Sequence, residues 1–156
     1  MAATNTKTVW LSTPQQRAWR AYISGSTLLF DQLDRDLREQ YDISLPEYEI
    51  LVRLSEAPDR SLRMAELASS VAHSRSRVTH TIGRMQDKGL VERRACPTDR
   101  RGVIASLTER GWDLLVEAAP VHVRGVREHL VDIADPGDLA AVGRVFAQVG
   151  DGLAGP

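Results

Sequence analysis

Cysteine is almost missing from the sequence, because Cys96 is the only one among 156 residues. A single thiol excludes an internal disulfide framework and a metal site built from several cysteines. Long apolar runs are also missing, since none approaches the roughly 18 residues that a membrane-spanning helix needs. Residues 1–10 contain no apolar segment of the kind found in a signal peptide. We therefore expect a cytoplasmic protein without a membrane partner.

Catalytic motifs are missing too. The chain has no Gly-rich phosphate loop, no Gly-x-Ser-x-Gly turn, no His-Glu-x-x-His pair and no Cys–His constellation. His122 and His129 lie seven residues apart on one expected helix face, but no third ligand is near them in the sequence. These absences predict that the protein is not an enzyme and holds neither a metal ion nor a cofactor.

Charge is distributed unevenly along the chain. The formal net charge is −1, yet residues 60–101 contain ten Arg and Lys against four Asp and Glu, a local charge of +6. The rest of the chain therefore carries −7. A basic segment in an otherwise acidic protein predicts a surface that faces a polyanion.

Hydrophobic periodicity predicts a mainly helical protein. The expected helices cover residues 14–40, 44 to just before Pro58, 63–71, 74–88, a long stretch from Thr108 and a last stretch from Asp135. A flexible leader over residues 1–12 precedes them, and a break at Ala72-His73 separates the third from the fourth. Ser44 with Glu47 forms a capping box. Ser74 and Thr108 are expected N-caps.

The chain after residue 90 predicts a small β-hairpin followed by a long helix. Residues 90–94 and 103–107 are strand-like, and residues 96–101 form a charged turn between them. Pro120 lies inside the helix that follows and is expected to kink or split it. The residues expected to be buried along this helix are Trp112, Leu115, Val116, Ala119, Val123, Val126 and Leu130.

The helix over residues 74–88 has two contrasting faces. Val78, Ile82 and Met85 fall together on the expected core side. The other side and the N-terminal end carry donors, namely Ser74, Arg75, Ser76, Arg77, Thr79, His80 and Arg84. An ordinary solvated helix face mixes Glu and Lys, whereas a helix that enters a DNA groove needs donors and few acids. The pattern favours a DNA-recognition helix.

Several segments together resemble the MarR family of multiple-antibiotic-resistance regulators. The residues that carry the resemblance are Leu45-Pro46-Glu47-Tyr48-Glu49-Ile50-Leu51-Val52-Arg53-Leu54, Met64-Ala65-Glu66-Leu67-Ala68, Ser74-Arg75-Ser76-Arg77-Val78-Thr79-His80-Thr81-Ile82-Gly83-Arg84-Met85, Lys88-Gly89-Leu90-Val91-Glu92-Arg93, Asp99-Arg100-Arg101-Gly102 and Leu107-Thr108-Glu109-Arg110-Gly111. The Asp-x-Arg segment followed closely by Leu-Thr-x-x-Gly is the most specific of these.

The resemblance implies a winged helix-turn-helix over residues 44–108, flanked by dimerisation helices over 14–42 and 109–153. It implies a homodimeric transcriptional regulator, a repressor by family default, on a pseudo-palindromic operator. Recognition helix 74–88 would enter the major groove, and wing 95–102 the minor groove. Arg101 would be the minor-groove finger and Asp99 its anchor through a forked pair. The other wing contacts, to phosphates, would come from Arg94 and Arg100.

The resemblance leaves the sensing of a signal open. Many relatives bind a small-molecule effector between the DNA-binding region and the dimerisation helices. Trp19, Arg20 and Tyr22 are candidate ligand-binding residues, although aromatic side chains at helical spacing more often lie in a core or a dimer interface. Cys96 has no partner in the sequence, so an inert thiol is favoured over a redox sensor.

Two other classes of binding protein compete with a regulator that binds double-stranded DNA. A winged-helix domain can bind another protein instead of DNA, since a fold does not dictate its function. RNA is a weaker alternative, because the basic segment lacks the exposed aromatic residues that stack on single-stranded bases.

Overall fold

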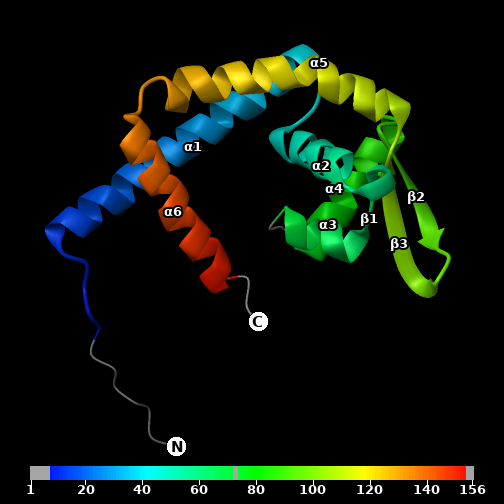
Figure 1. The fold of residues 1–156 in the computed structure, drawn as a ribbon, viewed down its shortest axis with the longest axis horizontal. Helices are drawn as coiled ribbons and strands as arrows, with labels where there is room; N and C mark the ends of the chain where they lie inside the picture. The colour runs from blue at the N-terminus through cyan, green and yellow to red at the C-terminus, as the bar shows by residue number, and fades with distance from the viewer. Residues whose placement is uncertain (1–7, 72–73, 154–156) are drawn as a thin grey trace, which may run out of the picture.

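Three long helices form one side of the protein, and a smaller lobe packs against two of them (Figure 1). The computed structural model describes residues 8–71 and 74–153, so the break expected at Ala72-His73 and most of the expected leader lie outside the described residues. The long helices are α1 (Thr13–Tyr41), α5 (Glu109–Val126) and α6 (Pro136–Leu153). A single π-helical turn, η2 (Arg127–Val131), extends α5. The mainly helical prediction is confirmed.

Polar side chains start the helices where the sequence predicts. Ser44 accepts a hydrogen bond from the Glu47 backbone and starts α2 (Leu45–Glu56), while Glu47 bonds back to the Ser44 backbone. Ser74 caps α4 (Arg75–Asp87), and Thr108 caps α5. The remaining short helix, α3 (Met64–Ser70), has Arg63 at its N-cap position.

The hairpin belongs to a three-stranded antiparallel sheet that the sequence does not fully predict. Strands β2 (Val91–Cys96) and β3 (Asp99–Leu107) form the hairpin. A short strand that was not expected, β1 (Ser61–Arg63), follows the 3-10 turn η1 (Pro58–Arg60) and pairs with the other side of β3. The order β1-β3-β2 places β3 in the middle, and thereby fixes the hairpin to the chain segment that enters α3.

The core of the lobe contains the apolar faces of α2, α3 and α4 together with the base of the sheet. Its largest fully buried side chains include Leu51, Leu54, Leu67, Ile82 and Met85. Leu37 of α1 and Leu115 of α5 join the same cluster, so the lobe and the long helices share one core. Among the described residues, none of the helices has the length and apolar character needed to cross a membrane.

The long helix α5 departs from the prediction in part. Of the kink or split expected at Pro120, the split does not occur, since one helix runs through the proline. Proline removes the backbone donor to the carbonyl four residues earlier, here that of Val116. The hydroxyl of Tyr41 donates to the next carbonyl along the helix, that of Glu117, at 2.8 Å. Of the residues expected to be buried, Val116 and Val123 are each 53% exposed. They lie seven residues apart, on a face that this single chain leaves uncovered.

Candidate nucleic-acid interface

Helix α4 presents the two faces that its sequence predicts. Val78, Ile82 and Met85 are at most 1% exposed and pack into the core. At its end, Gly89 has φ of +71°, and the amides of Gly89 and Leu90 donate back to the carbonyls of Gln86 and Met85. This is a Schellman ending, in which glycine takes the left-handed conformation without strain. The chain therefore turns directly from α4 into β2.

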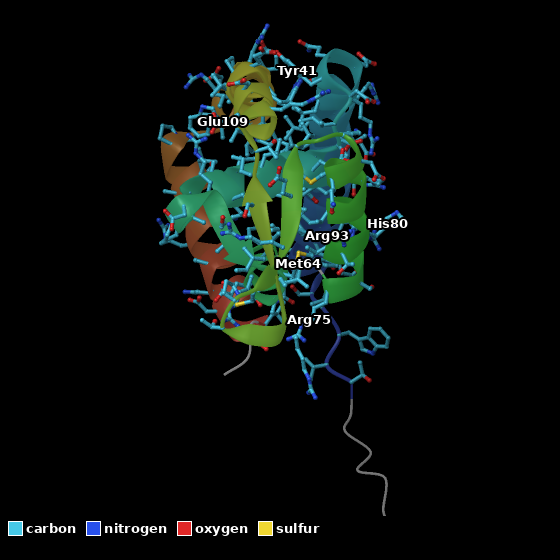
Figure 2. The ribbon with its side chains drawn as sticks, turned by 90° about the vertical axis from the view of Figure 1, so that its right-hand side faces the viewer. Tyr41, Met64, Arg75, His80, Arg93 and Glu109 are labelled. Carbon is cyan, nitrogen blue, oxygen red and sulfur yellow. The ribbon has the colours of Figure 1, made fainter. Side chains whose placement is uncertain are left out.

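The opposite face of α4 projects its donors away from the protein. Ser76, Arg77, Thr79 and His80 are exposed, and Figure 2 shows His80 pointing outward from the body. Thr79 donates within the helix to the carbonyl of Arg75, at 2.8 Å. The one carboxylate of the helix, Asp87, is its last residue. The outward face thus offers hydroxyl, imidazole and guanidinium donors with no acid among them.

Arg84 occupies a different position from the other candidates on this helix. Its Nε lies 3.7 Å from Oε1 of Glu47, whose side chain is only 3% exposed. Lys88 lies 3.7 Å from the second oxygen of the same carboxylate, and that oxygen also accepts from the backbone and hydroxyl of Ser44. Arg84 therefore neutralises a buried charge at the start of α2, while half of its side chain stays exposed.

The wing has a shorter turn than the sequence predicts. β2 extends to Cys96 and β3 starts at Asp99, so the turn contains only Pro97 and Thr98. Cys96 pairs with Asp99 while Ala95 pairs with Val103, which leaves residues 100–102 as a bulge in β3. The bulge is what gives these residues the appearance of a turn in the sequence. The side chain of Arg100 lies outside the described residues.

Asp99 anchors Arg101, but not through the forked side-chain pair that was expected. Its Oδ1 accepts from the backbone N–H of Arg101 at 3.0 Å. Its Oδ2 lies 3.3 Å from the guanidinium of Arg63, a residue outside the predicted interface. Asp99 therefore holds the backbone of the wing in place and leaves the Arg101 guanidinium unengaged by this carboxylate.

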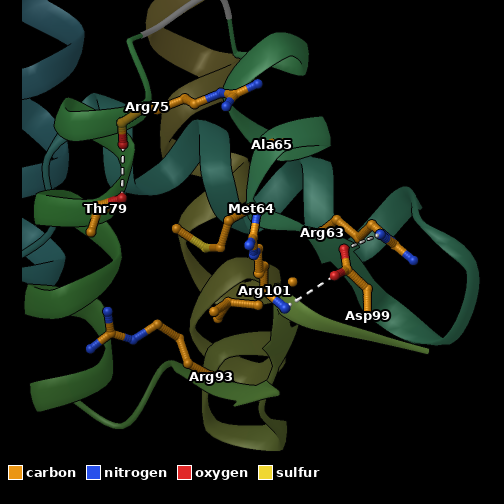
Figure 3. A pocket seen from close by; sticks show the side chains of 10 residues that line it. Arg63, Met64, Ala65, Arg75, Thr79, Arg93, Asp99 and Arg101 are labelled. Atoms are coloured by element: carbon orange, nitrogen blue, oxygen red, sulfur yellow. Dashed lines mark hydrogen bonds and ion pairs between the residues drawn. The ribbon is translucent and has the colours of Figure 1, made fainter. Parts of the chain in front are cut away.

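A hollow of about 350 Å³ separates α4 from the wing. Its wall carries four arginines and one acid, which are Arg63, Arg75, Arg93, Arg101 and Asp99 (Figure 3). Of the predicted site residues, the structure brings Arg75, Thr79, Asp99 and Arg101 together around this hollow. The N-terminal end of α4 and the wing tip lie at the same end of the molecule (Figure 2).

The sequence predicts a DNA contact for Arg94 and none for Arg93, but it is Arg93 that lies in the hollow beside α4. Arg93 lines the hollow, and its Nε donates to Gln86 of α4 at 2.7 Å. Successive side chains of a strand point to opposite faces, so Arg94 projects from the face of β2 away from α4. Both are exposed. Sequence spacing alone does not show which of two adjacent arginines faces a helix elsewhere in the chain.

The proposed ligand-binding residues of α1 lie away from the lobe. The rings of Trp19 and Tyr22 are 5.9 Å apart, and Tyr22 lies 4.8 Å from Phe146 of α6. Arg20 is exposed on the same stretch of α1. None of the three lines a cavity that the structure describes between the lobe and the long helices. Of the three, Tyr22 contacts α6 through Phe146. Trp19 and Tyr22 remain 56% and 40% exposed in the single chain.

A different set of residues surrounds a cavity of about 480 Å³ between α2, α3, α1 and α5. Its apolar wall includes Phe30, Leu33, Val52 and Val126. His122 of α5 also lines it and stacks on Tyr48 of α2 at 4.4 Å between ring centroids. Nδ1 of His122 is buried without a hydrogen-bond partner, and burial lowers the pKa of this imidazole.

Known proteins match this architecture along most of the chain. The model of the MarR family matches residues 41–102. Sco3205, a MarR family transcriptional regulator from Streptomyces coelicolor solved in complex with DNA, is 40% identical, with a TM-score of 0.91 over 96% of this chain and 93% of that chain. This chain belongs to the MarR family.

Other relatives agree with this assignment. AbsC, a MarR family transcriptional regulator from the same organism, is 39% identical with a TM-score of 0.89 over 96% of this chain and all of that chain. The HTH-type transcriptional regulator MhqR of Bacillus subtilis is 27% identical over 70% of both chains. This MarR-family chain is therefore a DNA-binding transcriptional regulator and not an enzyme, as its sequence predicts.

Proposed function

We propose that this MarR-family chain acts as a homodimeric repressor on a pseudo-palindromic operator. Helix α4 lies in the major groove and the wing in the minor groove. The observation that carries the proposal is the acid-poor donor face of α4 beside a hollow walled by four arginines. Phosphates attract such a surface, and the narrow minor groove attracts arginine in particular.

The individual roles follow from where each side chain lies. Arg77 and His80, on the outward face of α4, read base edges, and Thr79 and Ser76 contact the same groove. Ser74 and Arg75, at the N-terminal end of α4, bind the phosphate that the helix dipole favours there. Arg101 enters the minor groove, and Arg93, which lines the hollow, binds a phosphate beside it. The resemblance to the family assigns phosphate contacts to Arg94 and Arg100 as well. Arg84, held by Glu47, binds a phosphate rather than a base.

The long helices support a dimer with a second copy of this chain. Helix α6 has 18 residues and none of them is buried. Its apolar side chains Val142, Val145, Phe146 and Val149 are between 38% and 54% exposed, and Val116 and Val123 of α5 are equally open. Apolar faces of this extent are unfavourable in water unless a partner covers them. Two-fold symmetry then sets the two copies of α4 about one helical turn apart, roughly 34 Å.

The test starts from a pool of random duplexes, from which the purified protein selects the sequences that it binds. We expect a selected site with two inverted half-sites, bound more tightly than a scrambled duplex and more weakly as salt rises. Arg101→Ala should weaken binding to the selected duplex by about 1–3 kcal/mol. Arg110→Ala is the matched control, since Arg110 lies in the first turn of α5, and its neighbour Glu109 lies toward the opposite end of the molecule from Arg75 (Figure 2). A failure to select any sequence would refute the proposal and favour the protein-binding alternative.

The cavity between the lobe and the long helices favours control by a small-molecule effector. It is largely apolar, and the polar residues Glu49, Arg53, Ser70 and His122 also line it. An effector changes DNA binding only if it prefers one conformation of the dimer. Screening small aromatic compounds for a change in operator affinity tests this, with His122→Phe as the variant that fills the ring position without its nitrogen atoms. Compounds that bind without changing operator affinity would exclude a regulatory role for the cavity.

A further inference from the structure

The helix α3 begins at an unusual residue. Arg63 has the extended backbone of an N-cap, with φ of −63° and ψ of 142°, and its backbone N–H donates to Oε2 of Glu66 at 3.1 Å. Half of a capping box is therefore present. Ser, Thr, Asp and Asn are preferred at this position because their side chains accept from the helix backbone. A guanidinium has no acceptor, so the side chain of Arg63 cannot complete the cap.

The side chain of Arg63 instead reaches the wing. One terminal nitrogen lies 3.3 Å from Oδ2 of Asp99, and the other donates to the hydroxyl of Thr98 at 3.4 Å. Arg63 and Asp99 are 36 residues apart in the chain. These contacts connect the entrance of α3 with the tip of the hairpin (Figure 3).

Asp99 contacts both Arg63 and Arg101. While Oδ2 pairs with Arg63, Oδ1 accepts the backbone N–H of Arg101. Gly102 permits the close packing, because a Cβ there would lie 2.9 Å from Cβ of Cys96 and 3.1 Å from Oδ2 of Asp99. The half-exposed carboxylate therefore lies at the bulge between the guanidinium of Arg63 and the backbone N–H of Arg101.

Stability is a poor explanation for this pair. The side chains of Arg63 and Asp99 are 43% and 45% exposed, and ion pairs at such exposure contribute little to the free energy of unfolding. A cap residue at position 63 would stabilise α3 more. The pair instead fixes the position of a bulged hairpin tip, in which Sγ of Cys96 also lies 3.3 Å from the Thr98 hydroxyl.

We propose that Arg63 is a positioning residue for DNA binding, which sets the place of Arg101 through its ion pair with Asp99. The proposal rests on the proposed role of the wing in DNA binding. Without the pair, the tip of the hairpin samples more positions, and Arg101 reaches the minor groove at a greater loss of conformational entropy.

The rival explanation is that Arg63 binds a DNA phosphate directly. The two explanations predict opposite effects at Asp99. If Asp99 positions the wing through Arg63, Asp99→Asn weakens DNA binding, even though it removes a negative charge from the interface. If Arg63 binds phosphate, the same substitution frees Arg63 and tightens binding. Asparagine retains an oxygen that can accept from the Arg101 backbone, so the substitution tests the ion pair.

The experiment compares Arg63→Ser, Asp99→Asn and the double variant with the wild type. Arg63→Ser supplies the missing cap, so its thermal unfolding midpoint should equal or exceed that of the wild type. Affinity is measured by fluorescence anisotropy on the duplex selected by the wild type. We expect each single variant to bind roughly five- to tenfold more weakly, and the double variant to lose no more than either one, because the two side chains act as a unit. Glu92→Gln is the matched control, since it removes an exposed carboxylate of β2 that does not touch the pair.

A second readout requires no DNA. Hydrogen exchange at the backbone amides of residues 98–102 should be faster in Arg63→Ser than in the wild type, and unchanged in Glu92→Gln. Unchanged exchange, additive losses in the double variant, or tighter binding of Asp99→Asn would each overturn the proposal. If the wild type selects no duplex, the proposed function fails, and the exchange measurement still decides whether Arg63 restrains the wing.

Discussion

Gly111, in the first turn of α5, has no room for a side chain. A Cβ at this position would lie 2.2 Å from the carbonyl oxygen of Leu90 and 2.7 Å from Cδ1 of Leu107. Carbon and oxygen atoms approach comfortably to about 3.3 Å, so Gly111→Ala must separate the start of α5 from the end of α4 by roughly 1 Å. The carbonyl of Leu90 also accepts from the backbone N–H of Thr108 at 3.1 Å, and the carbonyl of Gly89 accepts from the Thr108 hydroxyl at 2.7 Å. Both bonds lie across the same junction.

The expected loss of stability follows from these contacts. Two hydrogen bonds contribute about 1 kcal/mol each, and overpacking adds about 1–3 kcal/mol. The better helix propensity of alanine offsets about 1 kcal/mol. We therefore expect Gly111→Ala to lower the free energy of unfolding by roughly 2–4 kcal/mol in urea denaturation at one protein concentration, since the stability of a dimer depends on concentration.

The matched control is another helical glycine, Gly83 of α4. Nothing lies within 4 Å of a Cβ built there, so Gly83→Ala should stabilise the protein by about 0.5–1 kcal/mol. The steric argument is wrong if both substitutions change the free energy of unfolding equally, or if the Gly111→Ala protein is as stable as the wild type. Either result would show that the junction between α4 and α5 accommodates a methyl group without cost.

Three further predictions concern the interface, the dimer and pH. Arg84→Ala should weaken binding to selected and scrambled duplexes by the same factor, and a larger loss on the selected duplex would show that Arg84 reads a base. Deletion of residues 135–156 should raise the dimer dissociation constant in analytical ultracentrifugation, and an unchanged dimer would exclude α6 from the interface. Burial lowers the pKa of His122 in the folded state, so its contribution to stability is present above the ordinary pKa of histidine, near 6.5, and is lost as pH falls below it. The urea midpoint should therefore fall more between pH 7.5 and 5.5 in the wild type than in His122→Phe, and equal slopes would contradict this.

Local sequence signals predicted the helices well. Ser44, Ser74 and Thr108 each cap a helix because a cap depends on residues three positions apart, which the sequence displays directly. The glycine that ends α4 is likewise a local signal. The core face of α4 followed from periodicity, since Val78, Ile82 and Met85 share one side of a helix whatever packs against it.

Features that depend on distant partners were missed or misplaced. Strand β1 has only three residues, too few for an alternating pattern, and exists because β3 pairs with it. Residues 100–102 look like part of a turn in the sequence, because only the pairing of β3 with β2 shows that they form a bulge. Arg63 and Arg93 were not selected, since the Asp99 and Gln86 side chains that they contact come from other elements.

The burial of α5 was predicted too broadly for a similar reason. Periodicity identifies every apolar position on a helix but does not assign it to the chain's own core or to another surface. Leu115 packs into the core, whereas Val116 and Val123 remain open in a single chain. The same ambiguity affects Trp19 and Tyr22: the Trp19 ring lies against Tyr22, and the Tyr22 ring lies against Phe146 of α6.

The sheet order β1-β3-β2 has a consequence for how the protein behaves at high concentration. An open sheet with β3 in the middle has two outer edges with unpaired backbone groups, and such edges can recruit strands from other molecules. One edge, β1, is only three residues long. The other, β2, carries Glu92, Arg93 and Arg94 in succession, all exposed. Charged side chains and short length both hinder edge-to-edge association. The arginines of β2 therefore also protect the wing of the DNA-free protein against aggregation.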